Sequence, residues 1–211
     1  MIRVVIADDH TIVREGLKEI LSAAGDFEVV AEAVDGHQAI ERARTMAFDV
    51  LVLDMSMPGK SGMELIKQLK TEFPKLRIVV LTMHQENQYA VRAIRAGASG
   101  YLTKDAASEQ LVNAIRKVAS GGAFISAEVA ELLARQAQGA VQGAPHEALS
   151  DREFQVLRLL VSGAPLTDIG EDLHLSVKTI SAHKARILQK LGLSNQSELV
   201  RYAIAHGLGD P

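Results

Sequence analysis

Five residues that could bind a cation or an anion stand at the ends of short apolar runs in the first half of the chain: Asp8, Asp9, Asp54, Thr82 and Lys104. Three carboxylates brought together would repel one another, and a hard divalent cation relieves that repulsion. Oxygen ligands with several retained waters suit Mg²⁺. A hydroxyl and an ammonium beside them could hold the oxygens of a phosphoryl group carried on a carboxylate.

Each of these residues alone has an ordinary structural explanation. An Asp after a buried strand usually caps a loop, a Thr supplies a turn hydroxyl, and a Lys is a solvated charge. The occurrence of all five at the ends of four different apolar runs favours a functional set.

The apolar runs are rich in β-branched residues and lack polar alternation, which is typical of strands buried on both faces. They are Val4–Ile6, Val29–Val30, Val50–Leu53, Ile78–Leu81 and a weaker run at Gly100–Leu102. Between them lie segments with helical spacing, which carry Ile12, Leu17, Ile20 and Leu21, then Leu65, Ile66 and Leu69, then Val91 and Ile94 before Gly97. This order predicts an α/β doubly wound domain with a five-stranded parallel sheet over residues 1–124. Ligands of such sheets bind at the carboxyl ends of the strands, where the five residues would meet.

The pattern changes near residue 125. Residues 127–144 are rich in Ala and Gln and include Gly139 and Gly143, and Pro145 follows them. This composition predicts a partly helical linker over 125–147. The stretch 150–153, Ser-Asp-Arg-Glu, is a capping box that begins a helix. Further helical stretches at about 165–173, 177–191 and 195–206 predict a small all-α four-helix domain over 148–211.

Composition limits the function. A length of 211 residues suits two small domains, and a net charge of −3 argues against a chain that coats nucleic acid indiscriminately. Any DNA site must therefore be a local patch. The chain has no Cys, which excludes disulfides, thiolate nucleophiles and cysteine-bound metals. No apolar run approaches membrane-spanning length and the first is too short for a signal peptide, so we expect a cytoplasmic protein without a membrane partner.

One segment concentrates positive charge. No acidic residue lies between Asp172 and Glu198. On a helix over 177–191, Ile180, Ile187 and Leu191 share the face that must point to the core. The opposite face combines small residues with cations and would let the helix approach a groove while its edges hold phosphates: Lys178, Ser181, Ala182, Ala185, Arg186 and Gln189. A solvated charged face is the alternative, and His183 is expected to be packed or to cap rather than to read bases.

Residues 1–124 resemble a receiver domain, through the stretches 6–10, 53–59, 81–82 and 100–104. The resemblance implies that Asp54 accepts a phosphoryl group. It also implies that Asp9, Asp54 and the backbone carbonyl of Ser56 hold Mg²⁺, with Asp8 assisting through water.

The same resemblance implies roles for the two later strand ends. Thr82 and Lys104 would bind the phosphoryl oxygens, and Tyr101 would be the aromatic that changes rotamer with Thr82. His84, like Ser56, occupies a position that tunes phosphoryl lifetime in the family. Many receivers have Pro after the lysine, often in cis, whereas Asp105 stands here.

Residues 149–208 resemble the LuxR-type helix-turn-helix domain of NarL/FixJ-type response regulators, through 149–153, 175–183 and 188–193. In that family 177–191 would be the recognition helix in the major groove. The base-reading positions map to Ser181, Ala182 and Ala185. Lys178, Thr179 and Lys184 map nearer the DNA backbone. This chain departs from the family at Gly170, where Ala is usual, and at Asp168, where Lys or Glu is common.

We therefore expect a DNA-binding transcriptional response regulator of a two-component system, switched at Asp54 by a sensor histidine kinase, and not an enzyme. Mg²⁺ would be its cofactor, promoter DNA its target, a homodimer its activated form and RNA polymerase a further partner. One alternative is a phosphatase of the haloacid dehalogenase type. That class requires a second acid two residues after the nucleophilic Asp, and Ser56 occupies that position here. The other is a module whose helical domain binds protein, against which the acid-free basic helix argues.

Overall fold

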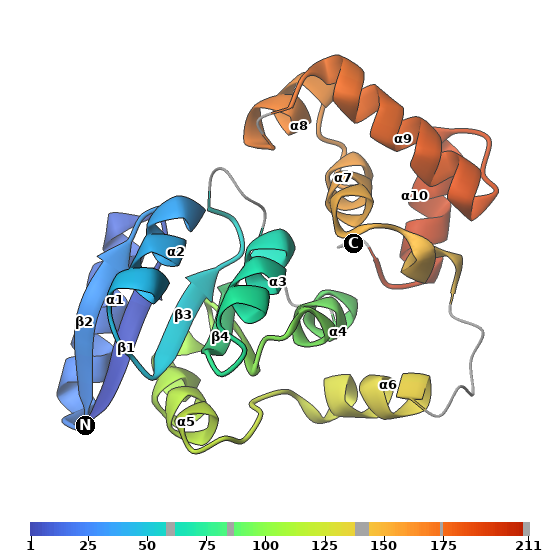
Figure 1. Ribbon diagram of the computed structural model, residues 1–211. Coiled ribbons are helices and arrows are strands. Elements are labelled where there is room, and N and C mark those ends of the chain that lie inside the picture. Colours follow the sequence, from blue (N-terminus) through green and yellow to red (C-terminus); the bar gives the residue numbers. More distant parts are fainter. Residues whose placement is uncertain (58–61, 84–86, 138–143, 174, 209–211) are drawn as a thin grey trace. The chain divides into compact units, whose positions relative to one another are not determined.

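The computed structural model describes residues 1–57, 62–83, 87–137, 144–173 and 175–208 (Figure 1). The chain divides into two compact units, residues 1–130 and 131–211. The division falls within helix α6 (Ala127–Ala137). The sequence-based borders at residues 124 and 148 bracket that helix, which lies in the segment expected to be a partly helical linker.

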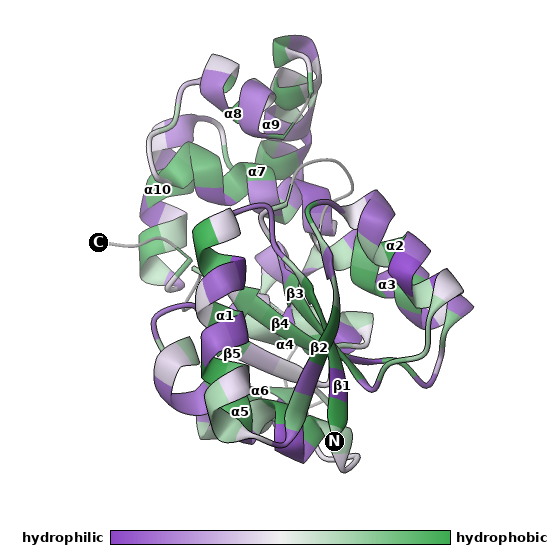
Figure 2. Ribbon diagram, turned by 90° about the vertical axis from the view of Figure 1, so that its left-hand side faces the viewer, coloured by the Kyte–Doolittle hydropathy of each residue, from purple (hydrophilic) through white to green (hydrophobic). Residues whose placement is uncertain are grey.

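The first unit contains one sheet of five parallel strands in the order β2-β1-β3-β4-β5. The strands are β1 (Ile2–Ala7), β2 (Phe27–Ala33), β3 (Val50–Asp54), β4 (Arg77–Thr82) and β5 (Gly100–Thr103). Every residue of β3 is buried, as expected of a central strand covered on both faces. Figure 2 shows β3 and β4 as predominantly hydrophobic. The five-stranded parallel sheet predicted from the apolar runs is confirmed.

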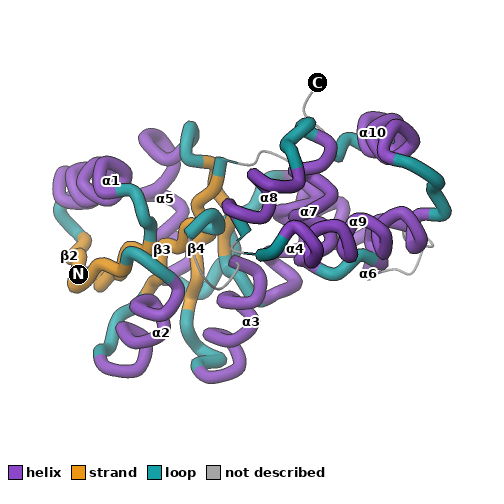
Figure 3. Tube along the Cα trace, turned by 90° about the horizontal axis from the view of Figure 1, so that it is seen from above, coloured by secondary structure: helices purple, strands orange, loops and turns teal. Residues whose placement is uncertain are grey.

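Helices cover both faces of this sheet. They are α1 (Thr11–Ala24), α2 (Gly36–Thr45), α3 (Gly62–Glu72), α4 (Asn87–Ala96) and α5 (Ala107–Ala119). Seen from above, α1 and α5 lie on one side of the sheet and α2 and α3 on the other (Figure 3). Leu17 and Leu21 of α1 and Leu111 and Ile115 of α5 share one core cluster with strand residues. In such a doubly wound arrangement, ligands bind at the carboxyl ends of the strands.

The inner face of α1 differs from the one predicted. Ile12 was grouped with the apolar stripe, but it is 87% exposed. The buried positions are Arg14, Leu17 and Leu21, which follow the i, i+3, i+7 spacing of one helix face. The prediction for Ile12 was wrong because that face continues toward the N-terminus through Arg14, which is only 8% exposed.

After α5 the chain returns to the open edge of the sheet. The backbone N–H of Phe124 donates to the carbonyl of Ser99 over 3.0 Å, and the N–H of Tyr101 donates to the carbonyl of Phe124 over 2.9 Å. Gly100 faces this segment, and a Cβ there would stand 3.4 Å from the Phe124 Cβ and carbonyl oxygen. The residues just before α6 therefore pair with β5.

The second unit is helical. It contains the 3-10 turn Pro145–Ala148 and the helices α7 (Asp151–Val161), α8 (Leu166–Asp172), α9 (Val177–Leu191) and α10 (Gln196–Ala205). The predicted capping box is present: the Ser150 side chain accepts from the Glu153 N–H, and the Glu153 carboxylate accepts from the Ser150 N–H. Ile180, Ile187 and Leu191 are buried, as the helical wheel predicts. Among the described residues of either unit, no helix has both the length and the apolar character needed to cross a bilayer.

Candidate functional site

The strand order brings the predicted strand-end residues to one edge of the sheet. Ala7 pairs with Leu53, so Asp8 and Asp54 leave neighbouring strands side by side. Thr82 lies on the next strand and pairs with Thr103, which directly precedes Lys104. The chain reverses its winding direction between β1 and β3, which is the position where open parallel sheets bind ligands.

Lys104 joins the two buried carboxylates. Asp8 and Asp54 are each 1% exposed. The Lys104 Nζ lies 2.8 Å from Asp8 Oδ2 and 3.0 Å from Asp54 Oδ2. The backbone N–H of Lys104 donates to the carbonyl of Thr82 over 2.7 Å. This bond holds the backbone of Lys104 beside the end of β4. One ammonium therefore compensates two carboxylates.

Asp9 and His10 complete the cluster on the loop after β1. The His10 Nδ1 lies 2.9 Å from Asp9 Oδ1 and 3.3 Å from Asp8 Oδ1, and His10 is 63% exposed at its side chain. Ligand atoms of Asp8, Asp9, His10 and Asp54 all lie within 4.8 Å of one another. His10 belongs to the stretch 6–10 that resembles a receiver, but it was not predicted for the site, because its contacts depend on the conformation of the loop after β1.

Burial sets the electrostatics of the cluster. Burial raises the pKa of Asp54 above its ordinary value, and the nearby charge of Asp8 adds to this, whereas Lys104 opposes it. Burial works to lower the pKa of Lys104, but its contacts with Asp8 and Asp54 outweigh burial and raise it. Negative charge thus exceeds positive charge at a site built from oxygen donors. This donor set fits a hard divalent cation such as Mg²⁺.

The remaining predicted residues of the first unit occupy the same edge. Ser56 is exposed, and its backbone N–H donates to Asp54 Oδ1 over 3.1 Å. Thr82 is fully buried and Tyr101 is half-buried. No peptide bond between described residues is cis, so the bond from Lys104 to Asp105 is trans. His84 lies outside the described residues, as do 58 and 59 of the motif that follows Asp54.

The outward face of α9 carries most of the residues predicted to contact DNA. Lys178, Ser181, Ala182, Ala185 and Arg186 are all exposed. Small side chains lie in the middle of this face, with a cation toward each end of the stretch. A helix of this kind can approach a groove closely, because the alanines and the serine project little.

Three other polar residues of α9 are engaged within the helical unit. The Lys184 Nζ donates to Gln196 Oε1 of α10 over 2.6 Å, and the half-buried Thr179 Oγ1 lies 2.8 Å from Ser176 Oγ. The Lys190 Nζ donates to Glu153 Oε2 over 2.6 Å. Lys184 and Thr179, both predicted near the DNA backbone, are half-buried and hydrogen-bonded within the helical unit.

His183 also faces inward. It is half-buried, and burial lowers the pKa of its imidazole, with the positive charges of Arg186 and Arg152 acting in the same direction. This environment favours the neutral imidazole. It agrees with the expectation of a packed histidine rather than a base reader.

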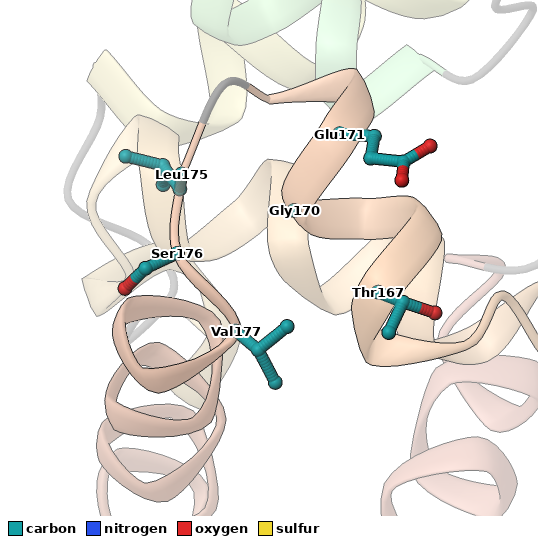
Figure 4. A pocket seen from close by; sticks show the side chains of 6 residues that line it. All are labelled: Thr167, Gly170, Glu171, Leu175, Ser176 and Val177. Carbon is teal, nitrogen blue, oxygen red and sulfur yellow. The ribbon is translucent and has the colours of Figure 1, made fainter.

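The turn between α8 and α9 depends on Gly170. A Cβ at this position would stand 2.7 Å from the carbonyl oxygen of Leu175, and the Leu175 N–H donates to the carbonyl of Gly170 over 2.8 Å. An alanine would force the turn and α8 apart. Figure 4 shows this junction, where a pocket of about 310 Å³ is lined by Thr167, Gly170, Glu171, Leu175, Ser176 and Val177. The departure from Ala thus has a local steric reason.

Comparison with known proteins covers both units. Residues 4–116 match the family of response regulator receiver domains, and residues 147–203 match the luxR family of bacterial regulatory proteins. Response regulator UvrY of Escherichia coli (strain K12) is 38% identical over 209 residues, spanning 99% of this chain and 96% of UvrY. Response regulator GacA of Pseudomonas viridiflava is 36% identical over 211 residues, spanning 100% of this chain and 99% of GacA.

Solved structures of a response regulator also match this chain over most of its length. RcsB from Salmonella enterica serovar Typhimurium, bound to a promoter in the presence of the phosphomimetic BeF3-, matches with a TM-score of 0.67 and 34% identity over 95% of this chain and 97% of that one. A complex of the two-component response regulator RcsB with DNA matches with a TM-score of 0.59 and 33% identity, over 97% and 98% of the two chains.

Proposed function

This chain belongs to the two-component response regulators that join a receiver domain to a LuxR-type DNA-binding domain, and we propose that phosphorylation of Asp54 controls its binding to promoter DNA. One observation carries the proposal. Asp54 is buried at the edge where the ends of four adjacent strands meet, with Asp8 and Lys104 beside it and a pKa raised by burial. A carboxylate held this way is poised to react with an electrophile rather than to remain a solvated charge.

The residues of the site divide the work of phosphoryl transfer. Asp9, Asp54 and the Ser56 carbonyl would hold Mg²⁺, with Asp8 acting through water, and the metal supplies charge neutralisation for the transferring group. The Asp54 carboxylate forms the new O–P bond as the N–P bond of the kinase phosphohistidine breaks. Lys104, which contacts both buried acids, exchanges a carboxylate partner for a phosphoryl oxygen. The Thr82 hydroxyl donates to another.

Tyr101 offers a route from this site toward the linker. Val80 pairs with Tyr101 and Thr82 with Thr103, so Thr82 and Tyr101 lie on the same face of the sheet. The backbone N–H of Tyr101 is bound to the carbonyl of Phe124, shortly before α6. A change of rotamer at Tyr101 would therefore act on a strand that pairs directly with the start of the linker.

The output would be binding of α9 to promoter DNA in the cytoplasm. Its outward face is exposed, free of acids and composed of small residues between cations. RcsB was solved bound to a promoter in the presence of a phosphomimetic, and as two dimers bound to two parallel DNAs. These relatives support a homodimer on DNA for this chain also, with a sensor histidine kinase as phosphodonor. Contact with RNA polymerase stays a prediction.

Phosphorylation of Asp54 can be tested by mass spectrometry of the whole protein. Incubation with acetyl phosphate and Mg²⁺ should add one phosphoryl mass to the wild type and none to Asp54→Asn. Asp49→Asn, directly before the opposite end of the same strand, is the matched control and should be labelled like the wild type. Asp9→Ala should be labelled much more slowly. Full labelling of Asp54→Asn would refute the assignment.

Coupling to DNA can be tested with beryllofluoride, which mimics a phosphoryl group on Asp54. Its addition should increase the affinity for DNA or the dimerisation constant by roughly 5- to 150-fold, the usual range for coupling between two sites. Equal DNA affinity and equal mass in solution, with and without beryllofluoride, would show that the receiver does not control this output.

A further inference from the structure

We propose that Arg14 is a positioning residue for the phosphorylation site, because its guanidinium fixes the peptide unit that joins Asp8 to Asp9. The inference rests on the proposed function of Asp54 and deepens it. Arg14 lies in the first turn of α1, and its backbone N–H donates to the carbonyl of His10 over 3.2 Å. This hydrogen bond closes the first turn of the helix that directly follows the acidic loop.

The Arg14 side chain is buried and holds three groups at once. Its Nη1 donates to the backbone carbonyl of Asp8 over 2.9 Å, and its Nε donates to Glu32 Oε2 over 2.7 Å. Its Nη2 donates to Thr11 Oγ1 over 3.3 Å. The rigid fork of the guanidinium suits this task, since its donors leave in fixed directions. The side chain therefore connects the acidic loop to β2 and α1.

The bond to the Asp8 carbonyl matters because a peptide unit is planar. The carbonyl of Asp8 and the backbone N–H and Cα of Asp9 lie in one plane. A hydrogen bond that fixes this carbonyl therefore also fixes the orientation of the Asp9 backbone. The other side of Asp8 is held as well, since its N–H donates to the carbonyl of Ala33 over 3.1 Å. β2 and Arg14 together therefore fix the backbone on both sides of Asp8, from which the two carboxylates project.

Glu32 keeps the charge of Arg14 from acting on the acids directly. Its carboxylate accepts from Arg14 at one oxygen and from Lys18 at the other, over 2.8 Å. These two hydrogen bonds, Lys18 first, lower the pKa of Glu32 below its usual value despite partial burial. Lys18 also donates to Glu15 over 2.6 Å, so two carboxylates balance the two cations of this network and the guanidinium charge is compensated within it. Arg14 acts on the site by position rather than by neutralising Asp8 and Asp9.

Calorimetric titration of the full-length, unphosphorylated chain with MgCl2 measures this effect without any turnover. Arg14→Met should weaken Mg²⁺ binding by about 10-fold or more, the usual effect of removing a group that orients a metal ligand. The phosphorylation rate at saturating Mg²⁺ should change far less than the Mg²⁺ concentration that gives half the rate. Arg77→Met is the matched control, because Arg77 also donates to a backbone carbonyl, that of Ala119, at the opposite end of the sheet. Its Mg²⁺ affinity should match the wild type.

Two further variants keep the test decisive if Arg14→Met fails to fold, which thermal melting would reveal. Arg14→Lys retains the charge but lacks the fork, so it should weaken Mg²⁺ binding about as much as Arg14→Met would. Glu32→Gln keeps an oxygen acceptor for the Arg14 Nε and should have a smaller effect than Arg14→Lys. Wild-type Mg²⁺ affinity in Arg14→Lys would overturn the positioning role, because charge alone would then suffice. A wild-type chain that neither binds Mg²⁺ nor is labelled would instead remove the proposed function itself.

Discussion

The two sites of this protein use charge in opposite ways. At the strand ends of the receiver, Asp8, Asp9 and Asp54 each lie within 3.0 Å of a nitrogen of Lys104 or His10. On α9, Lys178 and Arg186 are exposed, and neither forms a side-chain hydrogen bond or ion pair with any residue that the structure describes. The first site is assembled around its own charges, whereas the second leaves its charges for a partner.

This difference predicts how function and stability are connected at each site. A substitution within the receiver cluster removes a partner from a buried group, so it should change the free energy of unfolding as well as phosphorylation. A substitution on the outward face of α9 removes nothing that the fold needs, so it should change DNA binding alone.

The largest effect is expected for a glutamate in the middle of the α9 face. Ala182→Glu and Ala185→Glu should each reduce DNA affinity at least about 100-fold, because bulk and negative charge are placed where phosphates and base edges would approach. The melting temperature should stay that of the wild type, since both positions are exposed. Gel shifts with a fragment selected from random-sequence DNA would measure the loss. Ala134→Glu, an exposed alanine of α6, is the control for added charge. Normal DNA binding by both folded variants would favour a merely solvated face.

At the receiver site, Lys104→Met should destabilise the fold. Two buried carboxylates would lose their shared ammonium, and breaking a buried ion pair costs about 3–5 kcal/mol in the free energy of unfolding. Asp54→Asn should act in the opposite direction and stabilise by about 1 kcal/mol, since it removes like-charge repulsion. Urea unfolding of the receiver in EDTA would measure both. Lys75→Met, at an exposed position, should change little. Equal stability of all three variants would mean that the cluster carries no strain.

Glu153 extends the comparison to pH, because it shows that part of the charge on α9 serves the fold. Burial works to raise its pKa, but the hydrogen bond from Lys190 and those from Ser150 outweigh burial and leave the pKa below its usual value. A lowered folded-state pKa means stabilisation that is fully present above the usual value and lost as pH falls through the folded one. Glu153→Gln should therefore cost about 1–2 kcal/mol near pH 7. The difference from the wild type should shrink in thermal melts as the pH falls below about 4.3, the usual value for glutamate. A difference independent of pH would assign the loss to packing.

Strand ends are the part of the molecule that the sequence predicts best. A parallel sheet buried on both faces brings the carboxyl ends of its strands together, so Asp8, Asp54, Thr82 and Lys104 could be assembled from apolar runs and their order alone. The capping box at Ser150 and the buried face of α9 follow from local spacing in the same way. These features depend on periodicity, which a single sequence contains.

Contacts between distant segments could not be predicted. Arg14 looks like a solvated cation in sequence, and only the arrangement of α1 over β2 shows that it bonds to Glu32 and to the Asp8 carbonyl. Lys184 was mapped near the DNA backbone through the family resemblance, yet its Nζ donates to Gln196 of α10 over 2.6 Å. The pairing of Phe124 with β5 likewise depends on how the chain returns after α5. In each case the partner comes from another element, and helical or strand periodicity says nothing about it.

The smallest effect, and the most direct test of how α9 divides its charges, comes from comparing two lysines of that helix. Lys178 is exposed in the first turn beside the small residues, where a DNA phosphate is the expected partner. Lys178→Ala should weaken binding to selected and random DNA about equally and lower the slope of log affinity against log salt by about one, because one fewer counterion is released. Lys190 instead donates to Glu153. Lys190→Ala should leave that slope unchanged and lower the melting temperature of the helical unit. Identical salt slopes for Lys178→Ala and the wild type would place Lys178 away from the DNA backbone. Arg186 would then be the cation of the outward face of α9 that is expected to contact a phosphate.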